Sequence, residues 1–444
     1  TLMGEGLAQR GVRVSFSVKC SRQAAKSSDC ERRTLGNMTT LSPARRSFWQ
    51  DTHPSAVLAG LIAVVIGWAG PNVLIYSVQQ AGHLSDAAAM SWLWGHAVIT
   101  GIVGIYLSLR TRMPILSTWS TPGIALLVTA LPGMPFAEAV GAFLVSAALV
   151  FLLGTFAPLT RAVQAIPTHL AAALNAAILL PFAFKAVQAF GTQPLLVGLM
   201  VVTYFLGRQF APRWAVALVL LVGVAASALL GAWHPAPVPL APTVPQVVAP
   251  AFSVRAMLNL ALPLTLLAFT GQFVPGFGVL KANGYEPAPG PILRACGVAS
   301  AAAALVGCHN LTLGALLANI VSGPEAHPDA ARRYTAAIWA GIFNILFGLF
   351  AGTFLHLMGI LPAEALAALA GLALLAATGG SLQAAFTPGQ SASGRGAAQP
   401  GSLAAAVIIA VTLSGVSFFG IGAAFWGILA GLAVHGLEGV RRAG

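Results

Sequence analysis

The sequence predicts an all-α polytopic membrane protein with fourteen transmembrane segments, arranged as two inverted repeats of seven. Three observations carry this prediction. Hydrophobic residues make up 57% of the 444 residues and charged residues only 8%, with a mean hydropathy of +0.83, which leaves too little polar surface to coat a soluble globule. Apolar runs of about 20 residues, the length that crosses a bilayer, recur from Pro54 onward. Segments of the first half also resemble segments of the second half, in the same order.

The predicted spans are separated by short stretches that hold Pro, Gly and most of the charges. The boundary between the last two spans falls between Gly415 and Gly420. In order, the fourteen predicted spans are residues 55–76, 89–108, 117–131, 136–157, 168–184, 193–208, 213–232, 254–278, 290–306, 310–322, 335–357, 362–378, 402–416 and 421–437.

A basic leader precedes the first span. Nine of the 23 Lys and Arg residues lie before residue 50, in a Ser-rich, non-periodic stretch without the apolar core of a signal peptide. We expect residues 1–50 to form a disordered leader. Met38 begins a more ordinary start, "MTTLSPARRSFWQ", so residues 1–37 are expected to be an over-called start or a disordered tail.

The other fourteen basic residues predict the topology. With the N-terminus in the cytoplasm, the fourteen spans leave only Lys185 and Arg255 outside. This positive-inside bias predicts that both termini are cytoplasmic, and it explains the formal charge of +12 without nucleic acid. The twelve inward-facing residues are Arg110, Arg112, Arg161, Arg208, Arg213, Lys281, Arg294, Arg332, Arg333, Arg395, Arg441 and Arg442.

Internal repeats define the two halves. "GWAGPNVLIYSVQQAG" (67–82) aligns with "AFTGQFVPGFGVLKANG" (268–284) at an offset of 201, and "STPGIALL", "FLLGTF" and "IPTHLAAALNAAILL" have weaker counterparts in the same order. The repeats are residues 54–233 and 254–440, joined by a Pro-rich external linker, 234–253. Because seven is odd, the second repeat enters the membrane from the opposite face, as in alternating-access carriers with a substrate site near the midplane.

The third and tenth spans are expected to be half-helices preceded by short extended segments. In "LSTWSTPGIALL", the residue before Pro122 avoids the helical region and Pro fits a first helical turn, so the helix should begin near Pro122. The tenth span, "CHNLTLGALLANIVSG", is equally short and polar at its start. Two such helices would aim their positive ends into one space that suits an anion. The alternative is that Pro122 only kinks a packed helix.

The segments "RMPILSTWSTPGIALL", "HNLTLGALLANIVSGPEAHPDAARRY", "ALAALAGLALL" and "FFGIGAAFWGILAGL" closely resemble the BenE-type benzoate:proton symporters of bacteria, and the resemblance runs from Pro54 to Leu437. It implies a multi-pass inner-membrane carrier of benzoate or a related aromatic carboxylate, driven by the proton gradient without a cofactor. It also implies the fold of uracil permeases and sulfate-type anion carriers. In that fold a core domain (55–157, 254–357) lies beside a gate domain (168–232, 362–437), and homodimers form through the gate domain.

The candidate substrate site combines donors with aromatic surfaces. Backbone N–H groups around residues 121–124 and 310–313 would bind the carboxylate, with nearby hydroxyl and amide side chains assisting, and aromatic rings would contact the substrate ring. The alternatives are that the aromatic residues face lipid or the core and that the amides bond neighbouring helices. The candidates are Trp68, Asn72, Trp119, Ser120, Thr121, Pro122, Gly123, Gln272, Phe273, Phe277, His309, Asn310, Leu311 and Thr312.

Proton coupling lacks an obvious carboxylate. Uracil-permease relatives carry acidic residues in the eighth span and at the tenth half-helix, where this chain has Thr270 or Gln272 and Asn310. His309, at the mouth of the tenth half-helix, is therefore the first candidate for the proton carrier, and His96 in the second span is the other. A third possibility is that the substrate crosses as the neutral acid and carries the proton itself.

The loop "GPEAHPDAARRY" (323–334) is expected to form a polar network and positive-inside anchors rather than a metal or catalytic site. Within it, Glu325 could pair with Arg332 or Arg333 as an inner gate. The four cysteines, Cys20, Cys30, Cys296 and Cys308, indicate neither a disulfide nor a metal site.

Three classes of function remain. A proton-coupled symporter for an aromatic acid is the first. The alternative is an anion uniporter or channel, or a proton-coupled carrier of another small organic anion or a nucleobase. An enzyme is not expected, because the sequence has no HExxH, GxSxG or CxxC motif and no phosphate-binding GxxxxGK[ST].

Overall fold

The computed structural model describes residues 47–164, 167–387 and 402–443. From Phe48 onward the chain forms one compact unit. Most of the predicted leader, including Met38, lies outside the described residues. The last three leader residues, 48–50, differ from the expected disorder, because they belong to a short helix, α2 (Phe48–Asp51), whose final carboxylate is buried.

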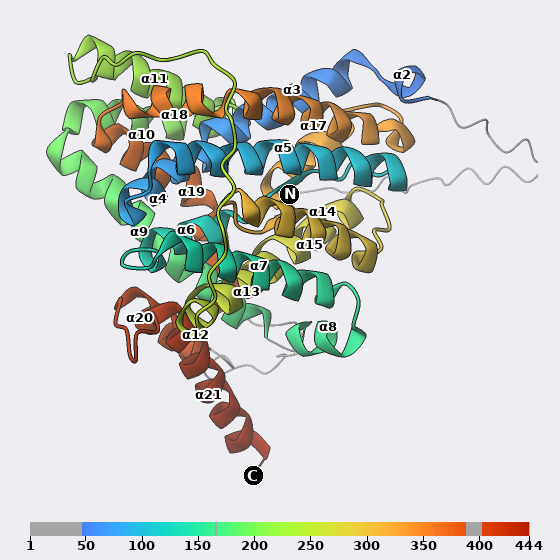
Figure 1. Ribbon diagram of the computed structural model, residues 1–444, viewed down its shortest axis with the longest axis vertical. Helices are drawn as coiled ribbons and strands as arrows, with labels where there is room; N and C mark the ends of the chain where they lie inside the picture. Colours follow the sequence, from blue (N-terminus) through green and yellow to red (C-terminus); the bar gives the residue numbers. More distant parts are fainter. Residues whose placement is uncertain (1–46, 165–166, 388–401, 444) are drawn as a thin grey trace, which may run out of the picture. The chain divides into compact units, whose positions relative to one another are not determined.

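The first half contains a series of helices interrupted by one short strand (Figure 1). Its elements are α3 (Pro54–Ala69), the 3-10 helix η1 (Pro71–Val73), α4 (Leu74–Gly82), α5 (Asp86–Thr111), β1 (Ser117–Trp119), α6 (Thr121–Ala130), α7 (Phe136–Leu153), α8 (Ala157–Gln164), α9 (Thr168–Thr192), α10 (Pro194–Phe210) and α11 (Ala215–Leu229).

The second half follows the same order of elements. They are α12 (Val254–Ala256), the π-helix η2 (Met257–Ala261), α13 (Leu262–Ala268), the π-helix η3 (Phe269–Phe273), α14 (Val274–Ala282), α15 (Pro289–Leu305), β2 (Leu311–Leu313), α16 (Ala315–Ser322), the 3-10 helix η4 (Ala330–Arg332), α17 (Tyr334–Leu349), α18 (Ala351–Gly359), α19 (Ala363–Phe386), α20 (Ser402–Leu413) and α21 (Ala423–Ala443).

Each predicted span contains a helix, and the chain is an all-α polytopic membrane protein. In the described residues, six helical units are long and apolar enough to cross a membrane, and a seventh is added if α17 and α18, bent by 66°, form one span. Several helices continue past the predicted ends of their spans, and the difference is largest in the fifth and twelfth. The fifth and twelfth spans were expected to end at residues 184 and 378, but α9 continues to Thr192 and α19 to Phe386, because a helix can extend past the apolar stretch that marks it in the sequence.

The first and eighth spans are interrupted at equivalent positions. Between α3 and α4 the helix breaks at Gly70 and Pro71. Between α13 and α14 the π-helix η3 widens the backbone around Gly271, which lies at the repeat offset of 201 from Gly70. Such irregular turns commonly mark functional positions within helices. The interruption therefore supports the alignment of the two halves.

The third and tenth spans begin as predicted, with extended backbone before a short helix. β1 and β2 pair antiparallel, with Ser117 opposite Leu313, Thr118 opposite Thr312 and Trp119 opposite Leu311. Because each strand leads directly into its helix and the strands are antiparallel, α6 and α16 leave the pair in opposite directions. The interpretation of Pro122 as a simple kink is wrong.

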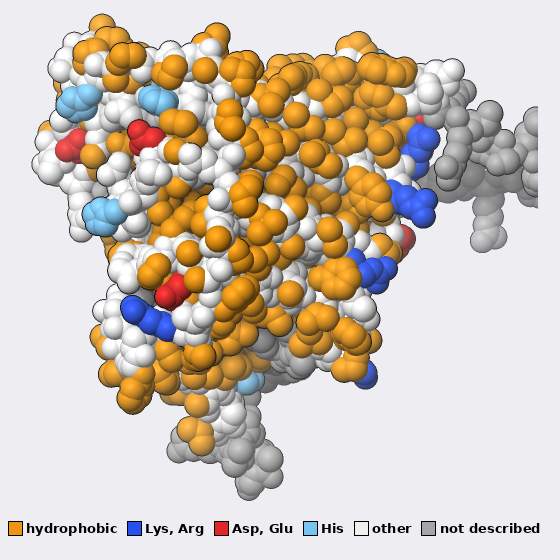
Figure 2. Space-filling view, viewed as in Figure 1, with side chains coloured by type: hydrophobic (Ala, Val, Ile, Leu, Met, Phe, Trp, Pro, Cys, Tyr) orange, Lys and Arg blue, Asp and Glu red, His pale blue; other side chains and the backbone are white. Residues whose placement is uncertain are grey.

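The helices pack in two groups. In the first, α3, α5 and α17 pack together, as do α7 and α15 (Figure 1). In the second, α9 packs along α19 and contacts α20, while α10 packs on α11 and α20 on α21. We call these the core group and the gate group, because they contain the helices predicted for the two domains. On the face in Figure 2, most Lys and Arg side chains gather at one edge, beside a broad hydrophobic band.

Candidate functional site

The two strands form the centre of the candidate site. Their pairing is extended at both ends, by Ser120 N–H donating to Asn310 O (3.0 Å) and by Gly314 N–H donating to Leu116 O (2.9 Å). Ser117 Oγ adds a hydrogen bond to Thr312 O (3.1 Å). This pairing satisfies extended backbone that lipid could not, so it holds both helix starts in fixed positions.

The two helix starts differ in their capping. Ser120 is fully buried and its Oγ accepts a hydrogen bond from Gly123 N–H (3.1 Å), which caps α6. The cap of α16 is Gly314, which has no side chain to bond the first turn. The positive end of α16 is therefore the less compensated of the two.

The second half-helix begins later in the sequence than expected. Residues 310–313 were expected to present N–H groups at the helix start, but Leu311 and Thr312 belong to β2 and α16 begins at Ala315. Leu311 N–H donates to Ser300 Oγ (2.8 Å), and the Asn310 side chain donates to Ser146 Oγ on α7 (2.9 Å). These two hydrogen bonds attach β2 and the residue before it to α15 and α7 of the core group.

A first cavity, of 320 Å³, lies where the core group meets the gate group. Thr121, Gln272, Asn72 and Trp68 line it, as does His96. Asn72 is 2% exposed and its Nδ2 has no hydrogen-bond partner among the described residues, which leaves a donor available to a bound molecule. Much of the remaining wall is apolar side chains of α3, α16 and α19.

Two arginines of the gate group, Arg208 and Arg213, also line this first cavity. None of the described residues that line it is acidic. The sequence analysis used both arginines only to predict the topology. Their position at the ends of neighbouring spans could have indicated that they lie close together. An apolar cavity with cationic and amide donors suits a small organic anion.

A second cavity, of 550 Å³, also lies beside the start of α6. Thr121 and Gln272 line both cavities, and Pro122 lines the second. The gate group contributes Asn175, whose Nδ2 donates to Ser381 Oγ (2.8 Å) while its Oδ1 has no partner among the described residues. Sequence reasoning missed Asn175, although an amide within the apolar run "LAAALNAAILL" could have indicated it.

Several predicted site residues line neither cavity. Trp119 and His309 are fully buried, and Phe273 is buried against the partly buried Phe277, with ring centroids 6.3 Å apart. Gly123 lies so close to His309 that an added Cβ would be 3.0 Å from its ring. The predicted residues absent from both linings are Trp119, Ser120, Gly123, Phe273, Phe277, His309, Asn310, Leu311 and Thr312.

The two candidate proton carriers both contact one tryptophan, Trp119. His96 stacks on Trp119 with ring centroids 4.1 Å apart, and His309 lies 5.5 Å from the same ring. His309 Nε2 lies 2.9 Å from Ser120 O, so Nε2 carries the hydrogen and Nδ1 is left without a partner in the described structure. His96 reaches the first cavity, whereas His309 does not.

The expected inner gate has a different partner. Glu325 pairs with Arg213 of the gate group, not with Arg332 or Arg333. Arg332 instead pairs with Asp329 (3.1 Å), and Arg333 donates to His327 O (2.9 Å). The prediction failed because Arg213 is more than 100 residues away in sequence and only packing brings it close.

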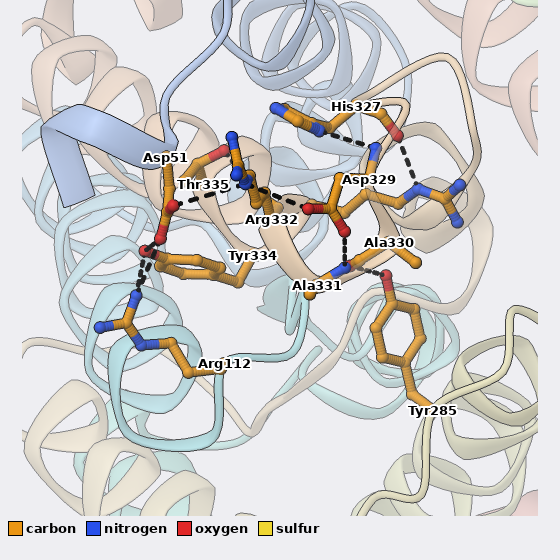
Figure 3. A network of polar contacts seen from close by, with 11 residues as sticks. Asp51, Arg112, Tyr285, His327, Asp329, Ala330, Ala331, Arg332, Tyr334 and Thr335 are labelled. Atoms are coloured by element: carbon orange, nitrogen blue, oxygen red, sulfur yellow. Dashed lines mark hydrogen bonds and ion pairs between the residues drawn. The ribbon is translucent and has the colours of Figure 1, made fainter. Parts of the chain in front are cut away.

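The loop at 323–334 forms the expected polar network (Figure 3). Asp329 N–H donates to His327 Nδ1 (3.0 Å), and burial lowers the pKa of His327, which favours the neutral ring that accepts this bond. Tyr285 donates to Ala330 O (2.9 Å). These bonds fold the loop against the end of the core group that the sequence analysis predicts to be cytoplasmic.

Asp51 extends this network, although the sequence analysis did not assign it a role. It accepts a hydrogen bond from Tyr334 Oη (2.8 Å) and pairs with Arg112 (3.2 Å) and Arg332 (3.6 Å) (Figure 3). The Arg112 guanidinium also lies over the Tyr334 ring, 4.6 Å from its centre. Asp51 therefore joins α2 to the ends of α5 and α17 in the core group.

Comparisons with known proteins agree with this architecture. The transmembrane domain of the cyanobacterial bicarbonate transporter BicA is similar with a TM-score of 0.55 and 15% identity, over 85% of this chain and 97% of that one. SLC26A9 is similar with a TM-score of 0.58 and 13% identity, over 96% of this chain and 73% of that one. These similarities show the SLC26/BicA-type transporter fold.

Sequence comparisons identify the family. The model of the benzoate membrane transport protein family, BenE, matches residues 50–437. The benzoate membrane transport protein of Acinetobacter baylyi is 37% identical over 398 residues, covering 90% of this chain and 98% of that protein. The inner membrane protein YdcO of Escherichia coli is 36% identical over 378 residues, covering 85% and 94%. The chain therefore belongs to the BenE family of benzoate membrane transport proteins, and it is a transport protein rather than an enzyme.

Proposed function

We propose that this chain is a secondary active transporter that imports benzoate or a related aromatic carboxylate, together with protons, across the bacterial inner membrane. The names of the relatives from A. baylyi and E. coli support the substrate and the membrane. The observation that carries the proposal is the first cavity, where apolar walls, the Asn72 amide and two arginines meet between the core and gate groups.

The position of the cavities supports the proposal of alternating access. Both lie at the boundary between the core and gate groups, so sliding one group past the other would change the side to which they open. Fourteen crossings in two inverted repeats, a core domain and a gate domain form the proposed framework. Cytoplasmic termini and a homodimer through the gate domain are further parts of the proposal, and no cofactor is required.

His96 is the proposed proton carrier in preference to His309, because His96 lines the first cavity and His309 does not. Imidazole changes charge near neutral pH, so a ring beside the substrate can exchange a proton with the cavity. The alternative is that the carboxylic acid itself carries the proton across.

The test is uptake of labelled benzoate into proteoliposomes. With an alkaline interior, we expect benzoate to accumulate above its external concentration, and a protonophore should abolish the accumulation. Uptake that only equilibrates, whatever the pH gradient, would instead support a uniporter or channel. Competition by unlabelled hydroxybenzoates, short aliphatic acids and uracil would distinguish an aromatic acid carrier from a carrier of another anion or a nucleobase.

A further inference from the structure

A third cavity lies at the opposite end of α6 from the strands. Its volume is 300 Å³, and it is bounded by the last turn of α6, by α9 near Pro181, by Arg255 and Asn259 at the start of the eighth span, and by residues 412–424. Like the first two cavities, it lies where the core group meets the gate group. α6, about 15 Å long, separates it from them.

The predicted topology puts this third cavity on the external face. The end of the third span, the end of the fifth, the start of the eighth and the turn between the last two are all predicted to be external, and all four contribute to the lining. Arg208 and Arg213, which line the first cavity, are predicted to be cytoplasmic. The third cavity and the first two therefore lie at different levels of the boundary between the core group and the gate group, with the third nearer the predicted external face.

Arg255 is the charged residue in the described lining of the third cavity. It is also one of only two basic residues predicted to be external. Its Nε–H donates to Gly420 O (3.0 Å), and its Nη groups have no acceptor among the described residues. A guanidinium that is anchored through Nε and open at Nη can still bind a carboxylate.

The surrounding groups suit the rest of an aromatic acid. Thr412 lines the cavity, and its Oγ1 is buried without a partner in the described structure. Pro132, Ile178 and Leu413 provide apolar walls. Gly420 has φ of +73° and packs against the Arg255 side chain, with an added Cβ only 3.3 Å from Nε, so the turn is shaped around the arginine.

We propose that the third cavity is an external capture site for the carboxylate substrate, with Arg255 as the receptor cation. The inference rests on the proposed function, and it adds a binding site distinct from the cavities beside the strands. Because Arg255 holds the 414–422 turn of the gate group through Nε, its open Nη groups can bind the carboxylate while this contact between the groups stays in place.

The test compares Arg255→Gln with Lys185→Gln in right-side-out membrane vesicles. Lys185 is the other basic residue predicted to be external, and it does not line this cavity, so both variants remove the same charge from the same face. We expect Arg255→Gln to raise the external KM for benzoate about tenfold, as for the loss of a charge-assisted hydrogen bond. Lys185→Gln should leave the external KM unchanged, and neither should change the KM for efflux from the inside.

Asn259→Ala separates charge from loop anchoring. Asn259 donates to the same Gly420 O (2.8 Å) and accepts from Gly422 N–H, but it carries no charge. An external KM raised as much by Asn259→Ala as by Arg255→Gln would overturn the proposal, as would an equal rise on both faces or no change in Arg255→Gln.

Two further measurements test the proposal even if Arg255→Gln does not insert into the membrane. Arg255→Lys, which keeps the charge, should retain an external KM within about threefold of wild type. The wild-type external KM should also rise with ionic strength, because salt screens an exposed cation, and a KM independent of salt would contradict the proposal. If wild-type vesicles take up no benzoate at all, the proposed function fails, whereas wild-type uptake with an unaltered Arg255→Gln variant removes only this inference.

Discussion

At the scale of single residues, burial separates two histidines that look alike in the sequence. His309 is fully buried and donates to Ser120 O, so its ring supports the start of α6. His96 stacks on Trp119 and lines the first cavity. His309 therefore holds the start of α6 in position, whereas His96 can contact a molecule bound in the cavity.

A histidine substitution tests this difference. His96→Gln should abolish accumulation of benzoate driven by a pH gradient while retaining exchange of labelled for unlabelled benzoate, because exchange requires no net proton movement. His309→Gln can still donate from its amide to Ser120 O, so it should keep gradient-driven accumulation. Parallel uptake and counterflow assays in proteoliposomes measure both properties. Full accumulation by His96→Gln would favour proton transfer on the substrate itself.

Asp51 is a second residue whose role depends on packing. Asp51→Asn leaves Arg112 and Arg332 without their buried partner, so we expect the free energy of unfolding to fall by about 1–3 kcal/mol. The loss should appear as a lower midpoint in tryptophan-monitored thermal unfolding in detergent. Asp329→Asn is the matched control, because that carboxylate is half exposed and should contribute less than about 1 kcal/mol. Equal midpoints for the two variants would contradict a central role for Asp51.

At the scale of elements, the start of α6 combines a structural and a functional position in adjacent residues. Ser120 caps the helix from a fully buried position, whereas Thr121 lines both cavities beside the strands. The helix start is held by the strand pairing, so a bound molecule meets a preformed surface. This arrangement predicts that neighbouring substitutions have different effects.

Ser120→Ala should lower the stability by about 1 kcal/mol through the lost cap, with a benzoate KM close to that of wild type. Thr121→Val keeps the side-chain shape but removes the hydroxyl from the cavities, so it should raise the KM while leaving the unfolding midpoint nearly unchanged. Thermal unfolding and initial uptake rates on the same preparations provide both values. The reverse pattern would mean that Ser120, not Thr121, contacts the substrate.

At the scale of the whole molecule, polar contacts join the core and gate groups at both ends of their boundary. Glu325 of the core group pairs with Arg213 of the gate group at the predicted cytoplasmic end. Arg255 and Asn259 bond the 414–422 turn at the predicted external end. Relative movement of the groups must break the contacts at one end or the other.

Glu325→Gln should therefore change the rate of benzoate exchange without affecting insertion. Both side chains of the pair are more than half exposed, and such pairs contribute under about 1 kcal/mol, so the change should be at most about fivefold. Glu286→Gln, which removes another exposed acid from the predicted cytoplasmic face, serves as the control. Unchanged exchange in Glu325→Gln would exclude this pair as a gate.

The sequence by itself determined the membrane class, the order of the helices and the broken third and tenth spans. These features depend on local hydropathy and on the backbone limits of Pro122 and its neighbours, which act over a few residues. Only the tertiary structure decided which side chains reach a cavity and which charges pair. Asn72 and Asn310 are both amides at interrupted spans, yet one faces the first cavity and the other bonds Ser146. Glu325 likewise meets Arg213 because packing joins segments more than 100 residues apart, and local sequence patterns carry no record of that distance.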